Sequence, residues 1–209
     1  VLGDGSRGNY AGVAPEAELY FQAMENDNNG NFQWSSINNM LNTAYNNGAR
    51  THTNSWGSTS LGFGVYSARS VQADIGARNY PNMTILFSAG NSGEDTTPKN
   101  GEIDFDSLGN PATAKNVFTV GASENDRTTF TSVWGPSYGS PISSDKLADN
   151  TSGMAAFSSR GPVDDGRIKP DISAPGTFIL STKSRSTTDT GWAAYNSSYT
   201  YMGGTSMAT

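Results

Sequence analysis

The sequence predicts an α/β protein with a mostly parallel central sheet and crossover helices. Strand-like and helical patterns alternate along the chain, which is the order expected when parallel strands are joined by crossover connections. Met83–Phe87 is a nearly continuous apolar run, and Val117–Val120 is a second one. Runs of this kind are typical of strands that are buried on both faces.

Two segments have the spacing of helices. In the first, apolar residues recur every three or four positions: Trp34, Ile37, Leu41 and Ala44. Asn47-Gly48 is a typical helix end, because glycine tolerates the left-handed conformation found there. A second helix is expected at Tyr66–Arg78, where Val71 and Ile75 lie four residues apart.

Further strands are expected at several shorter segments. Arg50–Trp56 and Phe178–Leu180 have strand character, and Tyr199–Met202 resembles a strand that leads into the end of the chain. Ala17–Phe21 is predicted to be a short apolar strand that follows a turn. Glu124–Thr151 is rich in Gly, Pro, Ser and Asp and has weak periodicity, so we expect a surface loop there.

Composition excludes several classes of protein. The chain has 209 residues and a mass of 22.1 kDa, which suits one domain or a large piece of one. Its formal charge of −6 argues against a nucleic-acid partner, because no basic surplus exists to displace counterions. The absence of cysteine excludes disulfides, thiolate zinc sites and cysteine nucleophiles. No apolar run reaches the roughly 18 residues needed to span a bilayer, so no membrane partner is expected.

Three short segments carry residues suited to catalysis or binding. Ser206 follows Gly204-Thr205 and can open a helix, where a backbone N–H favours developing negative charge; an ordinary helix cap is the alternative. Asn91 follows the most apolar strand and has an amide able to donate a hydrogen bond, although an ordinary turn explains it equally well. Ser55-Trp56-Gly57 ends another strand, and a buried tryptophan with a strand-ending glycine is the simpler interpretation.

The remaining candidates are weaker. His52 is the only histidine, but nothing in the sequence brings it near Ser206, so we expect a structural role. The loop that begins at Asp27 fails the EF-hand pattern, because Phe32 and Asn38 stand where Gly and Glu are required. Acidic residues at 102–106 and 164–165 are able to supply metal ligands, yet solvated turns are the commoner explanation, so metal ligands stay unknown.

Seven short motifs stand in a fixed order along the chain: Gly12-Val13-Ala14-Pro15, Ser55-Trp56-Gly57, Ala89-Gly90-Asn91, Asn110-Pro111-Ala112, Phe157–Pro162, Lys169–Gly176 and Gly204-Thr205-Ser206-Met207-Ala208. Taken together, they resemble the motifs of the subtilisin-like serine proteases (subtilases). The strand 50–57 is most similar to the bacterial oxidation-resistant alkaline protease branch.

The resemblance implies a three-layer subtilisin-like fold and a set of site residues. Ser206 would be the nucleophile of a serine endopeptidase, and Asn91 would hold the oxyanion together with the Ser206 N–H. Ser55, Trp56 and Gly57 would pair with the substrate backbone and form one wall of the specificity pocket, with Ala89 and Gly90 as the opposite wall. The resemblance also implies a secreted monomer that acts on proteins or peptides, needs no cofactor for catalysis and binds structural calcium.

The family's Asp and His motifs have no match in the sequence. Because these motifs precede the serine in subtilases, residues 1–209 are expected to be a partial catalytic domain that also lacks the helix after the nucleophile. On their own these residues are expected to fold poorly and to have no useful proteolytic activity.

Three other functions remain as alternatives. One is a catalytically inactive relative that binds peptides along the Ser55-Trp56-Gly57 edge by strand addition. A carbohydrate-binding β-sandwich fits the composition, but the two helical patterns oppose it. An α/β-hydrolase esterase requires Gly where this chain has Ala208.

Overall fold

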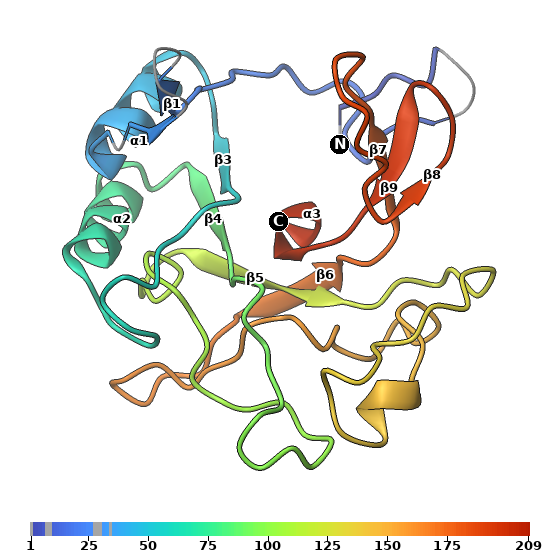
Figure 1. Ribbon diagram of the computed structural model, residues 1–209. Helices are drawn as coiled ribbons and strands as arrows, with labels where there is room; N and C mark the ends of the chain where they lie inside the picture. The colour runs from blue at the N-terminus through green and yellow to red at the C-terminus, as the bar shows by residue number, and fades with distance from the viewer. Residues whose placement is uncertain (1, 7–9, 27–30, 34) are drawn as a thin grey trace.

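The centre of the protein is a four-stranded parallel sheet (Figure 1). The computed structural model describes residues 2–6, 10–26, 31–33 and 35–209. The strands β3 (Thr51–Asn54), β4 (Thr84–Ser88), β5 (Phe118–Ser123) and β6 (Ile172–Pro175) lie in that order, and each neighbouring pair is parallel. The predicted α/β class with a mostly parallel sheet is therefore confirmed.

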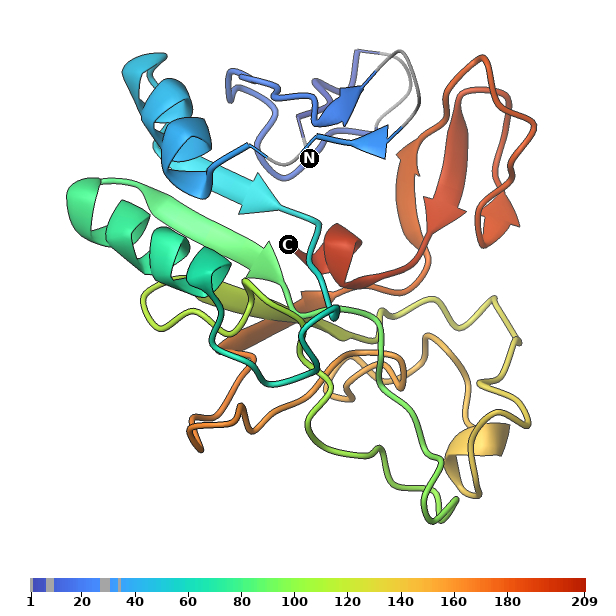
Figure 2. The same ribbon diagram turned by 60° about the vertical axis from the view of Figure 1, so that its left-hand side comes forward.

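Helices lie on the two sides of this sheet and complete three layers (Figures 1 and 2). Helices α1 (Ile37–Asn46) and α2 (Ala68–Asn79) pack against each other on one side. The short helix α3 (Thr205–Ala208) lies on the other side, where it contacts β4, β5 and β6. The last helix of the chain is thus packed against the middle of the central sheet.

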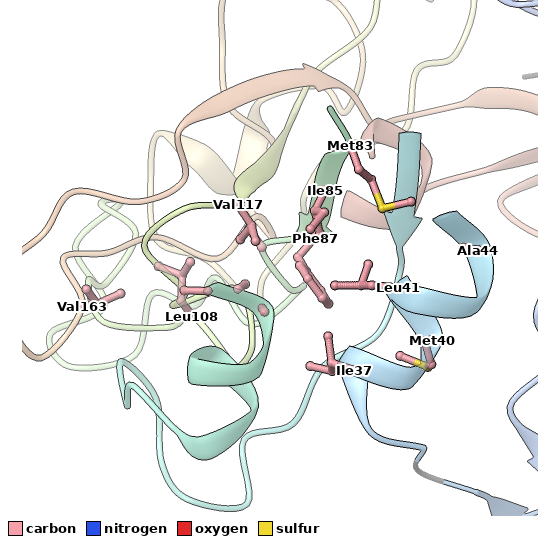
Figure 3. Packing of buried hydrophobic residues seen from close by; sticks show 14 residues of the cluster. Ile37, Met40, Leu41, Ala44, Met83, Ile85, Phe87, Leu108, Val117 and Val163 are labelled. Carbon is pink, nitrogen blue, oxygen red and sulfur yellow. The ribbon is translucent and has the colours of Figure 1, made fainter. Parts of the chain in front are cut away.

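The first helix buries the face that the sequence predicts. Ile37, Leu41 and Ala44 are buried, together with Met40, whereas Trp34 and the loop 27–30 lie outside the described residues. The helix ends at Asn46, with Gly48 at a φ of 93°, as the Asn-Gly pair predicts. Figure 3 shows the side chains of α1 meeting those of β4.

The second helix presents a different face from the one predicted. Val71 and Ile75 are 39% and 42% exposed, and the buried positions are instead the small residues Ser70, Ala73 and Gly76. Close packing against α1 explains the difference, because a Cβ on Gly76 would lie 2.2 Å from Cδ1 of Leu41. Small residues let the two helices approach, so the larger apolar side chains are turned to solvent.

Truncation of Leu41 to alanine is expected to lower the free energy of unfolding by about 2–5 kcal/mol. Leu41 is fully buried in the core cluster that includes Phe87 and Ile85 of β4 (Figure 3), so the lost methyl groups leave a cavity. Urea unfolding of the purified protein measures the loss. Val71→Ala on the exposed face of α2 is the matched control and should change stability by less than about 0.5 kcal/mol. Equal losses for the two variants would contradict the packing described.

The strand predicted at Ala17–Phe21 is not formed. Leu19 and Phe21 are 70% and 78% exposed, and no strand is assigned to these residues. Alternating apolar character does not make a strand unless a neighbour pairs with its backbone groups. A two-stranded antiparallel pair follows instead, β1 (Glu25–Asn26) with β2 (Asn31–Phe32).

A second, antiparallel sheet lies beyond α3 (Figure 1). It consists of β7 (Ile179–Thr182), β9 (Tyr199–Met202) and β8 (Ala193–Ala194), in the order β7-β9-β8. The predicted strands at 178–180 and 199–202 are thus present, but they do not extend the central sheet. The predicted loop 124–151 contains the short 3-10 helix η1 (Ile142–Ser144) and is otherwise irregular apart from an isolated bridge between Val133 and Lys146.

Candidate active site

Two loops leave the central sheet at the carboxyl ends of the neighbouring strands β3 and β4. Asn54, the last residue of β3, pairs in register with Phe87 near the end of β4. The segments Ser55–Gly57 and Ala89–Asn91 follow directly, so the parallel arrangement brings them together. Ligands of open α/β sheets bind at this edge, beyond the carboxyl ends of the strands.

Hydrogen bonds join Asn91 to the start of α3. The Asn91 Oδ1 atom accepts from the backbone N–H and from the hydroxyl of Thr205, each at 2.9 Å. The Thr205 hydroxyl in turn accepts from the Gly90 N–H at 3.2 Å. Because a backbone N–H can only donate, the amide atom facing Thr205 must be the oxygen. The donor end of the amide, Nδ2, is therefore directed away from these contacts and can serve an anion.

Ser206 is the second residue of α3, next to Thr205. The helix follows Gly204, which has a φ of 145° and whose N–H donates to the Gly176 carbonyl at 2.8 Å. The Ser206 carbonyl accepts from the Ser55 hydroxyl at 3.3 Å. Ser206, Asn91 and Ser55, which the sequence names from three separate segments, thus lie within one hydrogen-bonded group.

The Ser55–Gly57 segment is held by the core on one side and by a loop on the other. The Trp56 ring packs edge-on against Phe87, with centroids 5.4 Å apart. Ser58 exchanges backbone hydrogen bonds with Asn110, at 2.8 and 3.0 Å, and a Cβ on Gly57 would lie 3.2 Å from the Asn110 carbonyl. In the described part of the chain, β3 is the first strand in the order β3-β4-β5-β6, and the Ser55–Gly57 segment continues from its end.

Ser159 braces the opposite segment on both sides of Asn91. Its N–H donates to the Gly90 carbonyl at 3.0 Å, and its hydroxyl accepts from the Ser92 N–H at 3.1 Å. Gly90 has a φ of 107°, and a Cβ there would lie 2.9 Å from the Ser159 hydroxyl, so glycine is required. Ala89 is buried and donates to the Val120 carbonyl of β5, which keeps this segment in register with the sheet.

Comparison with known proteins identifies the family of this site. The sequence matches the subtilase family along its whole length, residues 1–209. This chain belongs to the subtilase family. The resemblance of its motifs to the subtilisin-like serine proteases is therefore confirmed.

Relatives of this subtilase include proteins from a slime mould and a bacterium. Serine protease/ABC transporter B family protein tagD of Dictyostelium discoideum is 30% identical over 260 aligned positions, which cover 96% of this chain and 14% of that protein. Serine protease AprX of Bacillus subtilis is 35% identical over 130 positions, which cover 61% of this chain and 23% of that protein. The chain therefore spans less than a quarter of the length of each of these two relatives.

Solved structures agree on the fold. Sphericase is 24% identical with a TM-score of 0.59, over 100% of this chain and 56% of sphericase. The S41 psychrophilic protease is 25% identical with a TM-score of 0.57, over 98% of this chain and 55% of that protein. The subtilisin-like architecture predicted from the motifs is thus confirmed.

The only histidine of the 209-residue sequence, His52, forms hydrogen bonds with Gln22 and Asn54. Nε2 of His52 lies 3.0 Å from Gln22 Oε1, and Nδ1 lies 3.0 Å from Asn54 Nδ2. The Asn54 amide also donates to the Leu86 carbonyl at 3.0 Å, which fixes its nitrogen toward Nδ1. The ring therefore accepts at Nδ1 and donates from Nε2, in a neutral structural role as expected.

His52 is expected to make the protein less stable as the pH falls below about 6.5, the ordinary histidine value. Burial disfavours the imidazolium and lowers the pKa of His52. Below pH 6.5 the unfolded state therefore binds a proton that the folded state does not, and the free energy of unfolding decreases until the pH falls through the folded pKa. Urea unfolding between pH 5.5 and 7.5 measures this slope. His52→Gln should flatten the slope, and an unchanged slope in that variant would contradict the assignment.

The acidic stretches do not assemble a recognisable metal site. Among the described residues, no three Asp, Glu, His or Cys side chains gather in a way that would hold a metal ion. The Asp104 carboxylate accepts from the N–H and hydroxyl of Thr96, and the Asp165 carboxylate pairs with Arg167 at 2.9 Å. These contacts account for Asp104 and Asp165 as structural residues, so no calcium ligand is assigned to them.

No described helix is long and apolar enough to cross a membrane.

Two residues of the site were not singled out from the sequence. Thr205 lies inside the Gly204–Ala208 motif and Ser159 inside the Phe157–Pro162 motif, but the motifs do not say which side chains they contact. The signal that the sequence offered for Thr205 and Ser159 was that each lies within one of the subtilase motifs. The contacts themselves join positions 114 and 67 residues apart.

Proposed function

We propose that this chain forms part of the catalytic domain of a serine endopeptidase, which cleaves peptide bonds through an acyl-enzyme on Ser206. The observation that carries the proposal is the pair of hydrogen bonds from Thr205 to Asn91 Oδ1. They turn the Nδ2 donor end of the Asn91 amide away from Thr205, which is the residue directly before Ser206. A fixed donor next to a serine at a helix start is the arrangement that stabilises an oxyanion.

In the proposed reaction, the Ser206 hydroxyl oxygen attacks the peptide carbonyl and its proton passes to a general base. The tetrahedral oxyanion accepts hydrogen bonds from Asn91 Nδ2 and the Ser206 N–H. Collapse breaks the C–N bond, and the base returns the proton to the departing amine. Water then attacks the ester and regenerates the Ser206 hydroxyl. The reaction requires no cofactor.

The general base is proposed to be a histidine, oriented by an aspartate, that lies outside these 209 residues. Support comes from His52, the only histidine of the sequence, whose ring nitrogens already contact Gln22 and Asn54. Residues 1–209 would then be a partial catalytic domain, inactive by themselves. A serine without a base keeps its ordinary hydroxyl pKa and is a poor nucleophile.

The substrate is proposed to be an extended peptide that pairs with the backbone of the Ser55–Gly57 segment. Strand addition, in which main-chain hydrogen bonds hold an extended peptide, is a common mode of peptide recognition. The side chain before the scissile bond would lie between this segment and Ala89–Gly90. We further propose a secreted monomer, and calcium remains a prediction of the family resemblance without assigned ligands.

Covalent labelling with a fluorophosphonate tests the proposal in the intact enzyme that contains this chain. The oxygen of an activated serine displaces fluoride from the probe and forms a phosphonate ester, and peptide mass mapping locates the adduct. We expect the adduct on Ser206 in the folded protein and none after denaturation. Labelling of another serine, or no labelling of the folded protein, would overturn the assignment.

A catalytically inactive peptide-binding protein is the second candidate. The hydrogen bonds of His52 with Gln22 and Asn54 are equally compatible with this candidate, because they leave these 209 residues without a free histidine base. Saturable binding of an extended peptide, combined with no labelling of Ser206 in the intact protein, would establish this function in place of proteolysis.

A further inference from the structure

A series of aromatic rings, mostly in edge-to-face contact, lies against Gly203, three residues before the candidate nucleophile Ser206. Trp192 is its central member. The Trp192 ring meets Phe157 at a centroid distance of 5.9 Å and Phe178 at 5.2 Å, with interplanar angles of 88° and 81°. Phe178 is buried and stacks on Phe130 at a centroid distance of 4.0 Å, so the Trp192 ring packs against a pair of stacked aromatic rings.

The backbone delivers Trp192 to one particular place. Its N–H donates to the Tyr201 carbonyl of β9 at 2.8 Å, after Gly191 turns the chain with a φ of 57°. A Cβ on Gly203 would lie 2.1 Å from the Trp192 ring, so the ring occupies the space where Gly203 would carry a side chain. Gly203 is three residues before Ser206. Trp192 is nevertheless 36% exposed, which leaves part of the ring available for contact.

The position of Trp192 relative to the scissile bond follows from the layout of the site. The acyl part of the substrate is proposed to lie along Ser55–Gly57, at the ends of β3 and β4. Both views of the structure show α3 between these strands and the β7-β9-β8 sheet (Figures 1 and 2). A peptide held at Ser206 therefore directs its leaving-group part toward the antiparallel sheet, where Trp192 covers Gly203.

We infer that Trp192 forms an apolar wall for the leaving-group residues of the substrate and makes the enzyme prefer an aromatic or large aliphatic residue just after the scissile bond. The inference rests on the proposed function of Ser206. An indole supplies a large rigid apolar surface, and a side chain that packs on it gains both burial and ring contacts. Small or acidic residues at that position gain neither.

Partition of the acyl-enzyme between water and added amines tests this directly. An ester substrate acylates Ser206, and phenylalaninamide or glycinamide then competes with water for the acyl group. The amine nitrogen attacks the ester carbonyl, and Ser206 recovers its proton as it leaves. The ratio of amide product to acid product reports leaving-side binding within one acyl-enzyme, independently of how fast each variant forms that intermediate.

We expect phenylalaninamide to be preferred over glycinamide by about tenfold or more, the discrimination typical of an apolar pocket. Trp192→Ala should bring the preference close to one, and Trp192→Phe should retain much of it. Tyr195→Ala is the control, because Tyr195 lies on the same hairpin, is exposed, and packs on Tyr201. It should leave both ester hydrolysis and the preference unchanged.

The outcomes separate the two proposals. Ester hydrolysis with no preference for phenylalaninamide, or a preference that survives in Trp192→Ala, would overturn the inference and leave the nucleophile intact. A loss of preference in Tyr195→Ala equal to that in Trp192→Ala would also overturn it, because the hairpin as a whole would then be responsible. Absence of any Ser206 acyl-enzyme in the intact enzyme would overturn the proposed function and this inference together.

Discussion

Replacing Ser206 with alanine is expected to lower kcat of the intact enzyme by a factor on the order of 10⁶, the loss known for the nucleophile of subtilisin. Without the hydroxyl no acyl-enzyme forms, whereas the segments proposed to bind the substrate are untouched. KM for a peptide substrate should therefore change little. Steady-state hydrolysis of a chromogenic peptide measures both constants, and active-site titration counts competent enzyme.

Ser186→Ala provides the matched control for this change. Ser186 is exposed in the connection between β7 and β8, so the same chemical deletion is made away from the site. Its kcat should equal that of the unmodified enzyme. Residual activity of Ser206→Ala above about 1% of normal, in a preparation free of unmodified enzyme, would show that another residue is the nucleophile.

The spacing of apolar residues correctly predicted the buried face of a helix where that face depends only on the helix's own sequence. Leu41 and its neighbours at helical spacing are buried, because α1 has a single apolar face. The pattern failed at Val71 and Ile75, because the packing of α2 is decided by the approach of Leu41 to Gly76 across two helices. Strand β6 was missed for a related reason. Ile172–Pro175 pairs through its backbone with β5 at the edge of the sheet, and proline is tolerated in such edge strands.

The sequence predicted which motifs form the candidate site, but it did not predict which side chains of these motifs contact one another. Ser206, Asn91 and Ser55 were all named from the sequence, and the structure brings them together. The role of Thr205 in orienting Asn91 was not predictable, because it depends on hydrogen bonds between residues 114 positions apart. The same holds for Trp192, whose contact with Gly203 depends on the turn of a hairpin.

Asn91→Leu is expected to lower kcat by about 10²–10³, with little change in KM, because the lost amide contacts the oxyanion only as charge develops. Leucine approximately keeps the volume of the side chain and removes its Nδ2 donor, together with the Oδ1 acceptor of the two Thr205 hydrogen bonds. The range is the one known for the oxyanion asparagine of subtilisin, so agreement would place Asn91 in the same role. A change in KM alone would instead make Asn91 a residue of substrate binding.

Thr205→Val then tests whether Thr205 acts through Asn91. The change removes one of the two hydrogen bonds to Asn91 Oδ1 and the acceptor for the Gly90 N–H, but keeps the Thr205 N–H bond. One lost hydrogen bond of this kind corresponds to roughly a tenfold decrease in kcat. Thr205→Ser keeps the hydroxyl and should restore most of the rate. If Thr205 works by holding the amide, the double variant with Asn91→Leu should be no slower than Asn91→Leu alone, because the group being held is already absent. Losses that multiply in the double variant would mean that the Thr205 hydroxyl acts independently of Asn91.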